Sequence, residues 1–310
     1  MIQQTIKQTS FSVGRLAYGA MRISGAWDPS QVTQAMRERG KAALVAAFEA
    51  GYTLFDHADI YGQGSCESIH GELLREMPSM RDEIVIATKC GIRFGGDPNP
   101  DSPHRYDFSK EHILWSCDQS LARLGIETID IYQLHRPDLL MNPEEIAEAF
   151  DTLHRAGKVR YFGVSNFLPS FVTALQSALP NALCVNQVEI HLGRLDCFTD
   201  GTLDQCLSSS ITPLAWSPLG GGWLGEGGSV PAGSPRNHLL SLMDQMAAGY
   251  GVTRTEIALA FLLKHPSGIV PIVGSTRPEK IRQAVKATEI DLSREDWYRL
   301  LVAARQAPLP

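Results

Sequence analysis

The feature that most constrains the fold is a strand-like apolar run that recurs along the chain, each time followed by an amphipathic helical pattern. The runs occupy residues 15–18, 53–55, 84–87, 129–132, 159–164, 183–185, 212–215 and 269–273. Continuous apolar runs suit strands that are covered on both faces, as in parallel sheets. Eight strand–helix units predict an α/β fold, a (β/α)8 TIM barrel with long loops at its C-terminal face; a doubly wound sheet is the alternative.

Helix ends and loop compositions support one continuous domain. Asn142 before a proline and Glu145 predicts a capped helix start, and Gly157 marks the end of that helix. Thr253 followed by Glu256 predicts a second capped start. Two stretches rich in Gly, Ser and Pro, residues 91–103 and 220–235, lie between patterned segments and are predicted to be long loops. We therefore expect residues 1–310 to form a single barrel domain.

Composition argues against some classes of protein and indicates the cellular compartment. The net charge of -6 without a basic block argues against a nucleic-acid binder. The longest apolar runs, residues 42–48 and 257–263, are far shorter than the roughly 20 residues of a membrane span. The 6 cysteines form no CxxC pair and are expected to be free thiols, and the N-terminus has no secretory pattern. These features favour a cytoplasmic protein with no obligate protein partner.

Polar and aromatic side chains follow the predicted strands, where a (β/α)8 barrel places its chemistry. Asp56, Lys89 and His135 follow three of the runs, and Tyr61 lies on the loop after Asp56. A phenol is a poor acid at neutral pH, so Lys89 is predicted to lower the pKa of Tyr61. Asp56 would hold Lys89 by an ion pair, and His135 would hydrogen-bond a substrate oxygen. A reduction here would need a cofactor hydride, because no residue is an electron source.

Longer motifs around these residues resemble the aldo/keto reductase family, over residues 55–62, 87–89, 129–138, 157–167, 185–189 and 216–220. The resemblance runs from about Gly14 to Trp297 and is greatest to a bacterial branch of oxidoreductases. It implies NADPH-dependent reduction of an aldehyde or ketone. It also implies a catalytic tetrad of Asp56, Tyr61, Lys89 and His135, with Tyr61 as the proton donor.

The resemblance further implies a cofactor site for NADPH, formed by Ser165, Asn166, Gln187, Trp216, Ser217, Leu219, Gly274, Ser275, Thr276, Arg277, Lys280 and Gln283. Many family members have a lysine at the position of Gly274 and Glu-Asn at the positions of Gln283 and Ala284. Arg277, Lys280 and Arg282 still supply positive charge for the 2′-phosphate of NADPH. Glu279 is expected to point away from that phosphate, on another face of the helix. A GxGxxG fingerprint between a strand and a helix is absent from the sequence.

The resemblance implies a small carbonyl substrate, whose identity the sequence leaves open. Met21, Trp27 and Phe94 are predicted as apolar pocket walls, whereas Arg22, Arg93 and Arg136 either attract a carboxylate or face water. The segment 220–228 either folds over the cofactor pyrophosphate or is a flexible loop.

Two other functions are compatible with a barrel of this kind. One is a cofactor-binding redox sensor with little turnover. The other is a metal-dependent hydrolase that would use His57, Asp59 and His135, although no HxH or HExxH motif is present.

Overall fold

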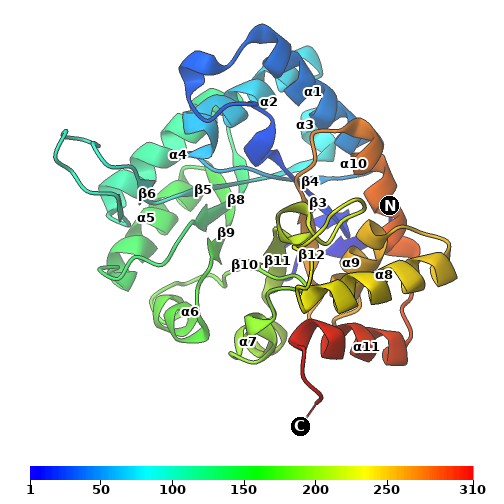
Figure 1. Ribbon diagram of the computed structural model, residues 1–310. Helices are drawn as coiled ribbons and strands as arrows, with labels where there is room; N and C mark the ends of the chain where they lie inside the picture. The colour runs from blue at the N-terminus through cyan, green and yellow to red at the C-terminus, as the bar shows by residue number, and fades with distance from the viewer. Residues whose placement is uncertain (310) are drawn as a thin grey trace.

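Eight parallel strands close into a barrel in the computed structural model, which describes residues 1–309 (Figure 1). In the order in which they pair, they are β10 (Val185–Glu189), β11 (Thr212–Trp216), β12 (Val270–Val273), β3 (Ala17–Gly19), β4 (Leu54–Asp56), β5 (Val85–Cys90), β8 (Ile129–Leu134) and β9 (Val159–Ser165). Each predicted apolar run overlaps one barrel strand, although the run 183–185 meets β10 only at Val185, so the predicted (β/α)8 fold is confirmed.

Helices surround the barrel on its outside (Figure 1). They are α1 (Gln34–Glu49), α2 (Ser65–Glu76), α3 (Met80–Glu83), α4 (Lys110–Leu124), α5 (Pro143–Arg155), α6 (Pro169–Gln176), α7 (Thr202–Ser208), α8 (Arg236–Tyr250), α9 (Arg254–Leu263), α10 (Pro278–Ala284) and α11 (Arg294–Arg305). Short 3-10 helices, η1 (Ala20–Arg22), η2 (Pro29–Gln31), η3 (Tyr61–Gly64), η4 (Asp196–Phe198), η5 (Gly220–Gly222) and η6 (Val285–Glu289), lie in the connections. Described residues contain no helix long and apolar enough to cross a membrane.

Capping explains two of the helix starts, with one difference from the prediction. The Asn142 side chain accepts from the first N–H groups of α5, as predicted. Glu145 does not close a capping box there, because its carboxylate instead accepts the backbone N–H of Lys110 at 2.8 Å. At α9 the predicted box is complete, with Thr253 and Glu256 bonding reciprocally.

The two ends of the barrel are built differently. At the N-terminal end, the hairpin of β1 (Gln3–Thr5) and β2 (Ser12–Gly14) carries the fully buried Ile6 and Val13 into the same apolar cluster as Leu54 and Ile131. This hairpin closes the bottom of the barrel. At the C-terminal end lie long loops, one containing the hairpin of β6 (Ile92–Arg93) and β7 (Arg105–Tyr106).

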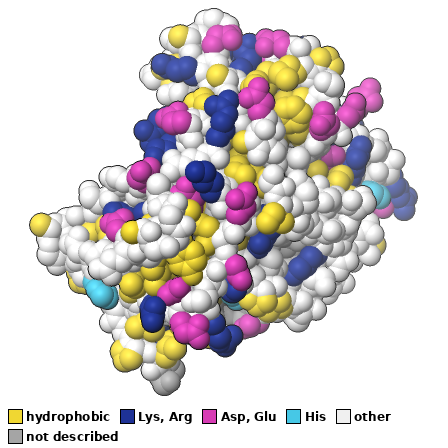
Figure 2. Space-filling view, turned by 90° about the vertical axis from the view of Figure 1, so that its right-hand side faces the viewer, with side chains coloured by type: hydrophobic (Ala, Val, Ile, Leu, Met, Phe, Trp, Pro, Cys, Tyr) yellow, Lys and Arg dark blue, Asp and Glu magenta, His cyan; other side chains and the backbone are white. Residues whose placement is uncertain are grey.

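Surface charge and thiols agree with the sequence analysis. On the face shown in Figure 2, Lys and Arg side chains are interspersed with Asp and Glu rather than gathered in one block. All six cysteines are free and buried: Cys66, Cys90, Cys117, Cys184, Cys197 and Cys206. Burial makes them small core residues.

Candidate active site

A buried lysine lies at the centre of the predicted tetrad. The Nζ atom of Lys89, in β5, donates to Asp56 at 2.8 Å and to the His57 carbonyl oxygen at 2.6 Å. The same atom donates to the Tyr61 hydroxyl at 3.2 Å. Lys89 is 0% exposed, and Asp56, the last residue of β4, is 3% exposed. Each ammonium proton therefore has a protein acceptor, and one carboxylate neutralises the charge.

Tyr61 and His135 lie next to each other beside this ion pair. Their ring centroids are 5.9 Å apart in an edge-on arrangement, and the Lys89 ammonium is 4.9 Å from the centroid of the Tyr61 ring. Both side chains are almost buried. His135 directly follows β8, and its backbone N–H donates to the carbonyl oxygen of Cys90 at 2.9 Å. The structure thus brings the four side chains of the predicted tetrad together at the barrel mouth.

Burial decides the protonation of the phenol. It raises the pKa of Tyr61 above its ordinary value, and the positive charge of Lys89 only partly offsets this rise. The sequence-based prediction of a lowered pKa is therefore wrong, because burial is the larger effect. Burial also lowers the pKa of Lys89, but the neighbouring Asp56 and Tyr61 more than compensate and the pKa is raised overall. At neutral pH Tyr61 is a phenol and Lys89 is charged.

His135 is a neutral imidazole at neutral pH. Burial lowers its pKa well below the ordinary range, and the charges of Lys89 and Arg136 lower it further. Its Nδ1 atom is buried and has no hydrogen-bond partner within residues 1–309. A neutral imidazole carries one N–H and one acceptor nitrogen, so it can donate to a substrate oxygen without carrying charge.

Asp59 fixes the loop that carries Tyr61, and the sequence analysis missed this role. Its backbone N–H donates to the Lys89 carbonyl oxygen at 3.1 Å, and its carboxyl group accepts the hydroxyl of Ser116 at 2.9 Å. Burial, assisted by the negative charge of Glu67, raises the pKa of Asp59 to about 7. In the sequence, the only sign of this role is a carboxylic residue in an apolar segment that directly follows a strand. The burial of Asp59 depends on the packing of α2 and α4, which the sequence does not reveal.

Polar side chains with the chemistry of an amide-binding site lie next to the tetrad. Ser165 Oγ donates to the Gln187 carbonyl oxygen at 2.9 Å, and Asn166 Nδ2 donates to Ser165 Oγ at 2.8 Å. The Gln187 amide donates to Asp56 at 2.7 Å, which links this group to the ion pair. Asn166 has a φ of 62°, in the left-handed region. The donors and acceptors of Ser165, Asn166 and Gln187 fit the carboxamide of a nicotinamide ring.

Trp216, at the end of β11, is held on two sides. Its indole N–H donates to Asn166 Oδ1 at 2.9 Å, and the other end of that amide donates to the His135 carbonyl oxygen at 3.2 Å. The guanidinium carbon of Arg136 lies 5.4 Å from the centroid of the Trp216 ring. Trp216 therefore presents a fixed, half-buried aromatic ring at the mouth.

The other residues predicted for the cofactor lie on the loop that follows β11, on the loop that follows β12 and in α10. They are Ser217, Leu219, Gly274, Ser275, Thr276, Arg277, Lys280 and Gln283. The carbonyl oxygen of Ser275 accepts the hydroxyl of Tyr18 at 3.0 Å, and Gln283 donates to Thr253 at 3.3 Å. The first contact fixes the loop after β12 against β3, and the second fixes α10 against the start of α9.

The three cations predicted to read the 2′-phosphate all face carboxylates. Arg277 lies 4.0 Å from Glu279, Arg282 lies 3.2 Å from Glu49, and Lys280 pairs with Glu226 of the loop 220–228. The expectation that Glu279 points away is wrong: its exposed side chain reaches back to the equally exposed Arg277. Glu226 places the loop 220–228 against α10, which the sequence had left open.

The predicted pocket walls lie on two loops at the mouth. Trp27 and Phe94 meet edge to face with ring centroids 6.2 Å apart, and Met21 is exposed nearby in η1. Gly62, directly after Tyr61, has a φ of 53°, and a Cβ there would lie 2.8 Å from the Ser24 hydroxyl. Glycine is needed at this position, and it lets the loop of Trp27 pack against the loop of the phenol.

The residues of the alternative metal site are bonded elsewhere. His57 Nε2 lies 2.8 Å from Nδ1 of the buried His70, and Asp59 bonds Ser116. Residues 1–309 include no cluster of three or more His, Cys, Asp or Glu side chains that could hold a metal ion. The geometry does not fit a metal-dependent hydrolase built on His57, Asp59 and His135.

The fold and this site define a (β/α)8 barrel with a cluster of proton-transferring side chains at its mouth, and comparison with known proteins specifies the family. Residues 15–303 match the aldo/keto reductase family. A 6-dehydroglucose reductase of Novosphingobium aromaticivorans is 39% identical over 305 residues, which cover 96% of each chain. The uncharacterized oxidoreductase YcsN of Bacillus subtilis is 42% identical over 261 residues, 84% of this chain and 86% of that one.

A solved structure agrees with these relatives. The thermostable aldo-keto reductase Tm1743, determined with the inhibitor epalrestat, has a TM-score of 0.82 at 26% identity and covers 98% of this chain and 100% of its own. The chain belongs to the aldo/keto reductase family and is an oxidoreductase of that family.

Proposed function

We propose that this protein is an NADPH-dependent carbonyl reductase in which residues 1–310 act as one barrel domain and Tyr61 donates the proton. The observation that carries the proposal is the contact of the Lys89 ammonium with both the Asp56 carboxylate and the Tyr61 hydroxyl, beside His135. A phenol, a buried ammonium and a neutral imidazole on one open barrel face suit proton donation to a carbonyl oxygen that gains electrons.

The residues divide this chemistry among them. The nicotinamide cofactor supplies the hydride when bound. Tyr61 Oη transfers its proton to the substrate oxygen, which becomes the alcohol, and the resulting phenolate regains a proton from solvent. Lys89, kept charged by Asp56, stabilises that phenolate across the 3.2 Å contact. His135 hydrogen-bonds the same substrate oxygen and so orients it toward Tyr61.

We propose that Ser165, Asn166 and Gln187 hold the carboxamide and that Trp216 covers one face of the nicotinamide ring. Their mutual bonds keep these groups oriented before the cofactor arrives, which lowers the entropic cost of binding. The 2′-phosphate would be bound by Arg277, because its 4.0 Å contact with the exposed Glu279 is looser than the ion pairs of Lys280 with Glu226 and of Arg282 with Glu49. The preference for NADPH over NADH is therefore expected to be moderate, about tenfold for one charge-assisted contact of an exposed arginine.

The experiment that tests the function is turnover of a neutral aldehyde by the purified protein. With 4-nitrobenzaldehyde and NADPH, we expect many turnovers per protein and one molecule of alcohol for each NADPH oxidised. The same protein incubated with NADPH alone gives the rate to subtract. NADPH binding without alcohol formation would instead support the cofactor-binding sensor.

A further inference from the structure

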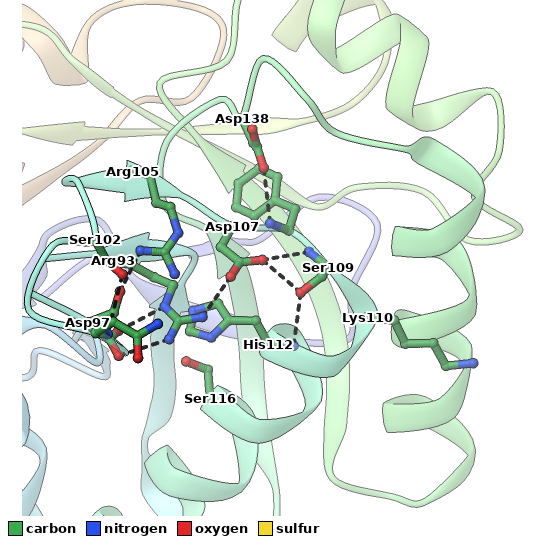
Figure 3. A network of polar contacts seen from close by, with 12 residues as sticks. Arg93, Asp97, Ser102, Arg105, Asp107, Ser109, Lys110, His112, Ser116 and Asp138 are labelled. Atoms are coloured by element: carbon green, nitrogen blue, oxygen red, sulfur yellow. Dashed lines mark hydrogen bonds and ion pairs between the residues drawn. The ribbon is translucent and has the colours of Figure 1, made fainter. Parts of the chain in front are cut away.

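Three arginines at the barrel mouth are equivalent in the sequence but differ in the structure. Arg93 is engaged by two carboxylates: it makes two bonds to Asp97, at 2.8 and 2.9 Å, and one to Asp107 at 2.9 Å (Figure 3). These bonds tie the β6–β7 hairpin to the start of α4. Arg22 is exposed at the end of η1. Neither arginine combines a free guanidinium with a fixed position.

Arg136 combines both properties. It is half-buried, and its guanidinium lies over the ring of Trp216 at 5.4 Å. Within residues 1–309 it has no carboxylate at ion-pair distance and donates no side-chain hydrogen bond. A guanidinium has five N–H donors and no acceptor, so this cation is positioned by an aromatic ring while its donors are unused.

The position of Arg136 is tied to the reacting groups. It directly follows His135, and Asn166 bonds both the His135 carbonyl oxygen and the indole N–H of Trp216. Nearby, the charges of Lys89 and Asp56 cancel in their ion pair. Arg136 is therefore an uncompensated positive charge beside the imidazole that would bind the substrate oxygen.

We propose that Arg136 is a specificity-determining residue that binds an anionic oxygen group, a carboxylate or a phosphate, on the carbonyl substrate. Guanidinium groups bind such anions through paired, charge-assisted hydrogen bonds. The aromatic pair Trp27 and Phe94 supplies apolar contact for the rest of the substrate. This assignment rests on the proposed function and goes beyond it by naming the substrate class.

Matched carbonyl compounds test the assignment. Three anionic substrates are each paired with a neutral analogue: succinic semialdehyde with 4-oxobutanamide, 4-carboxybenzaldehyde with 4-formylbenzamide, and glyceraldehyde 3-phosphate with glyceraldehyde. We expect the native enzyme to prefer the anionic member, and the pair with the largest preference distinguishes a carboxylate from a phosphate. Arg136→Met should lower kcat/KM for the preferred anion by about 10- to 100-fold, mainly through KM. Its neutral analogue should change by less than about threefold.

Two further variants separate a local contact from general charge. Arg136→Lys should recover part of the loss for the anion, and Arg22→Met, which removes the same charge elsewhere at the mouth, should leave both members of each pair unchanged. NADPH affinity, measured by fluorescence titration, should change by less than about threefold in all variants, because the bond to Asn166 still holds Trp216 when Arg136 is replaced. Equal losses for charged and neutral members, or no native preference for any anion, would overturn the assignment. Turnover of 4-nitrobenzaldehyde without reduction of any anionic compound would also overturn the assignment, whereas no turnover of 4-nitrobenzaldehyde or of any of the six compounds would refute the proposed function.

Discussion

Removal of either partner of the Asp56–Lys89 ion pair should destabilise the protein more than removal of both. Lys89 is fully buried and Asp56 nearly so, with 2.8 Å between the charged atoms. Breaking a buried pair leaves one charge without compensation and costs about 3–5 kcal/mol, whereas replacing both partners is close to neutral. We expect Asp56→Asn and Lys89→Met each to lose about 3–5 kcal/mol of unfolding free energy, and the double variant to lose no more than either single variant.

The assay is equilibrium urea unfolding followed by circular dichroism, combined into a double-mutant cycle. The exposed pair of Lys110 and Glu148, 3.0 Å apart, provides the control cycle with Lys110→Met and Glu148→Gln. Its coupling should stay below about 1 kcal/mol, because solvent screens exposed charges. The same Asp56 and Lys89 variants should each lose most of the turnover, with a double variant far less impaired than the product of the two losses. A coupling energy below about 1 kcal/mol for Asp56 and Lys89 would refute the reasoning.

Two further predictions concern the cofactor loop and the buried carboxyl group. Arg277→Ala should weaken NADPH binding about tenfold and leave NADH binding unchanged, as measured by fluorescence titration. Glu279→Gln should strengthen NADPH binding, because it removes the carboxylate that faces Arg277. Equal effects on NADPH and NADH would show that the loop does not bind the 2′-phosphate. In the folded protein the pKa of Asp59 is raised to about 7, whereas in the unfolded chain it is about 4. Between pH 4 and pH 7 the folded state therefore keeps a proton that the unfolded state has lost, so the free energy of unfolding falls as the pH rises through this range. Between pH 4 and pH 8, the free energy of unfolding of the native protein, measured by urea unfolding, should therefore fall by up to about 4 kcal/mol relative to that of Asp59→Asn. A difference between the two proteins that does not change with pH would contradict this prediction.

The sequence predicts the fold and the members of the tetrad because both depend on local order along the chain. Apolar runs define the strands, and each strand carries its polar end residue to the same face of the barrel. Asp56, Lys89 and His135 therefore converge whatever the details of packing, and Tyr61 needs only a short loop to join them.

The sequence does not predict what depends on partners far along the chain. The direction of the Tyr61 pKa shift follows from how deeply the loops bury it, which no local pattern encodes. The partners of Lys280 and Arg282, namely Glu226 and Glu49, come from other elements of the fold. Arg93 and Arg136 look alike in the sequence, and only the packing of the mouth pairs one with carboxylates and leaves the other over Trp216.

The most direct test of the central claim, that Tyr61 donates the proton, is the kcat of Tyr61→Phe with 4-nitrobenzaldehyde, measured together with the Kd for NADPH. Loss of the hydroxyl removes the proton and the contact with Lys89 but keeps the ring, so kcat should fall by about 10²–10⁴-fold while Kd changes by less than about threefold. Tyr161→Phe, whose hydroxyl bonds Ser10 in the loop between β1 and β2, should match the native enzyme in both values. A kcat for Tyr61→Phe within about threefold of native would contradict the account.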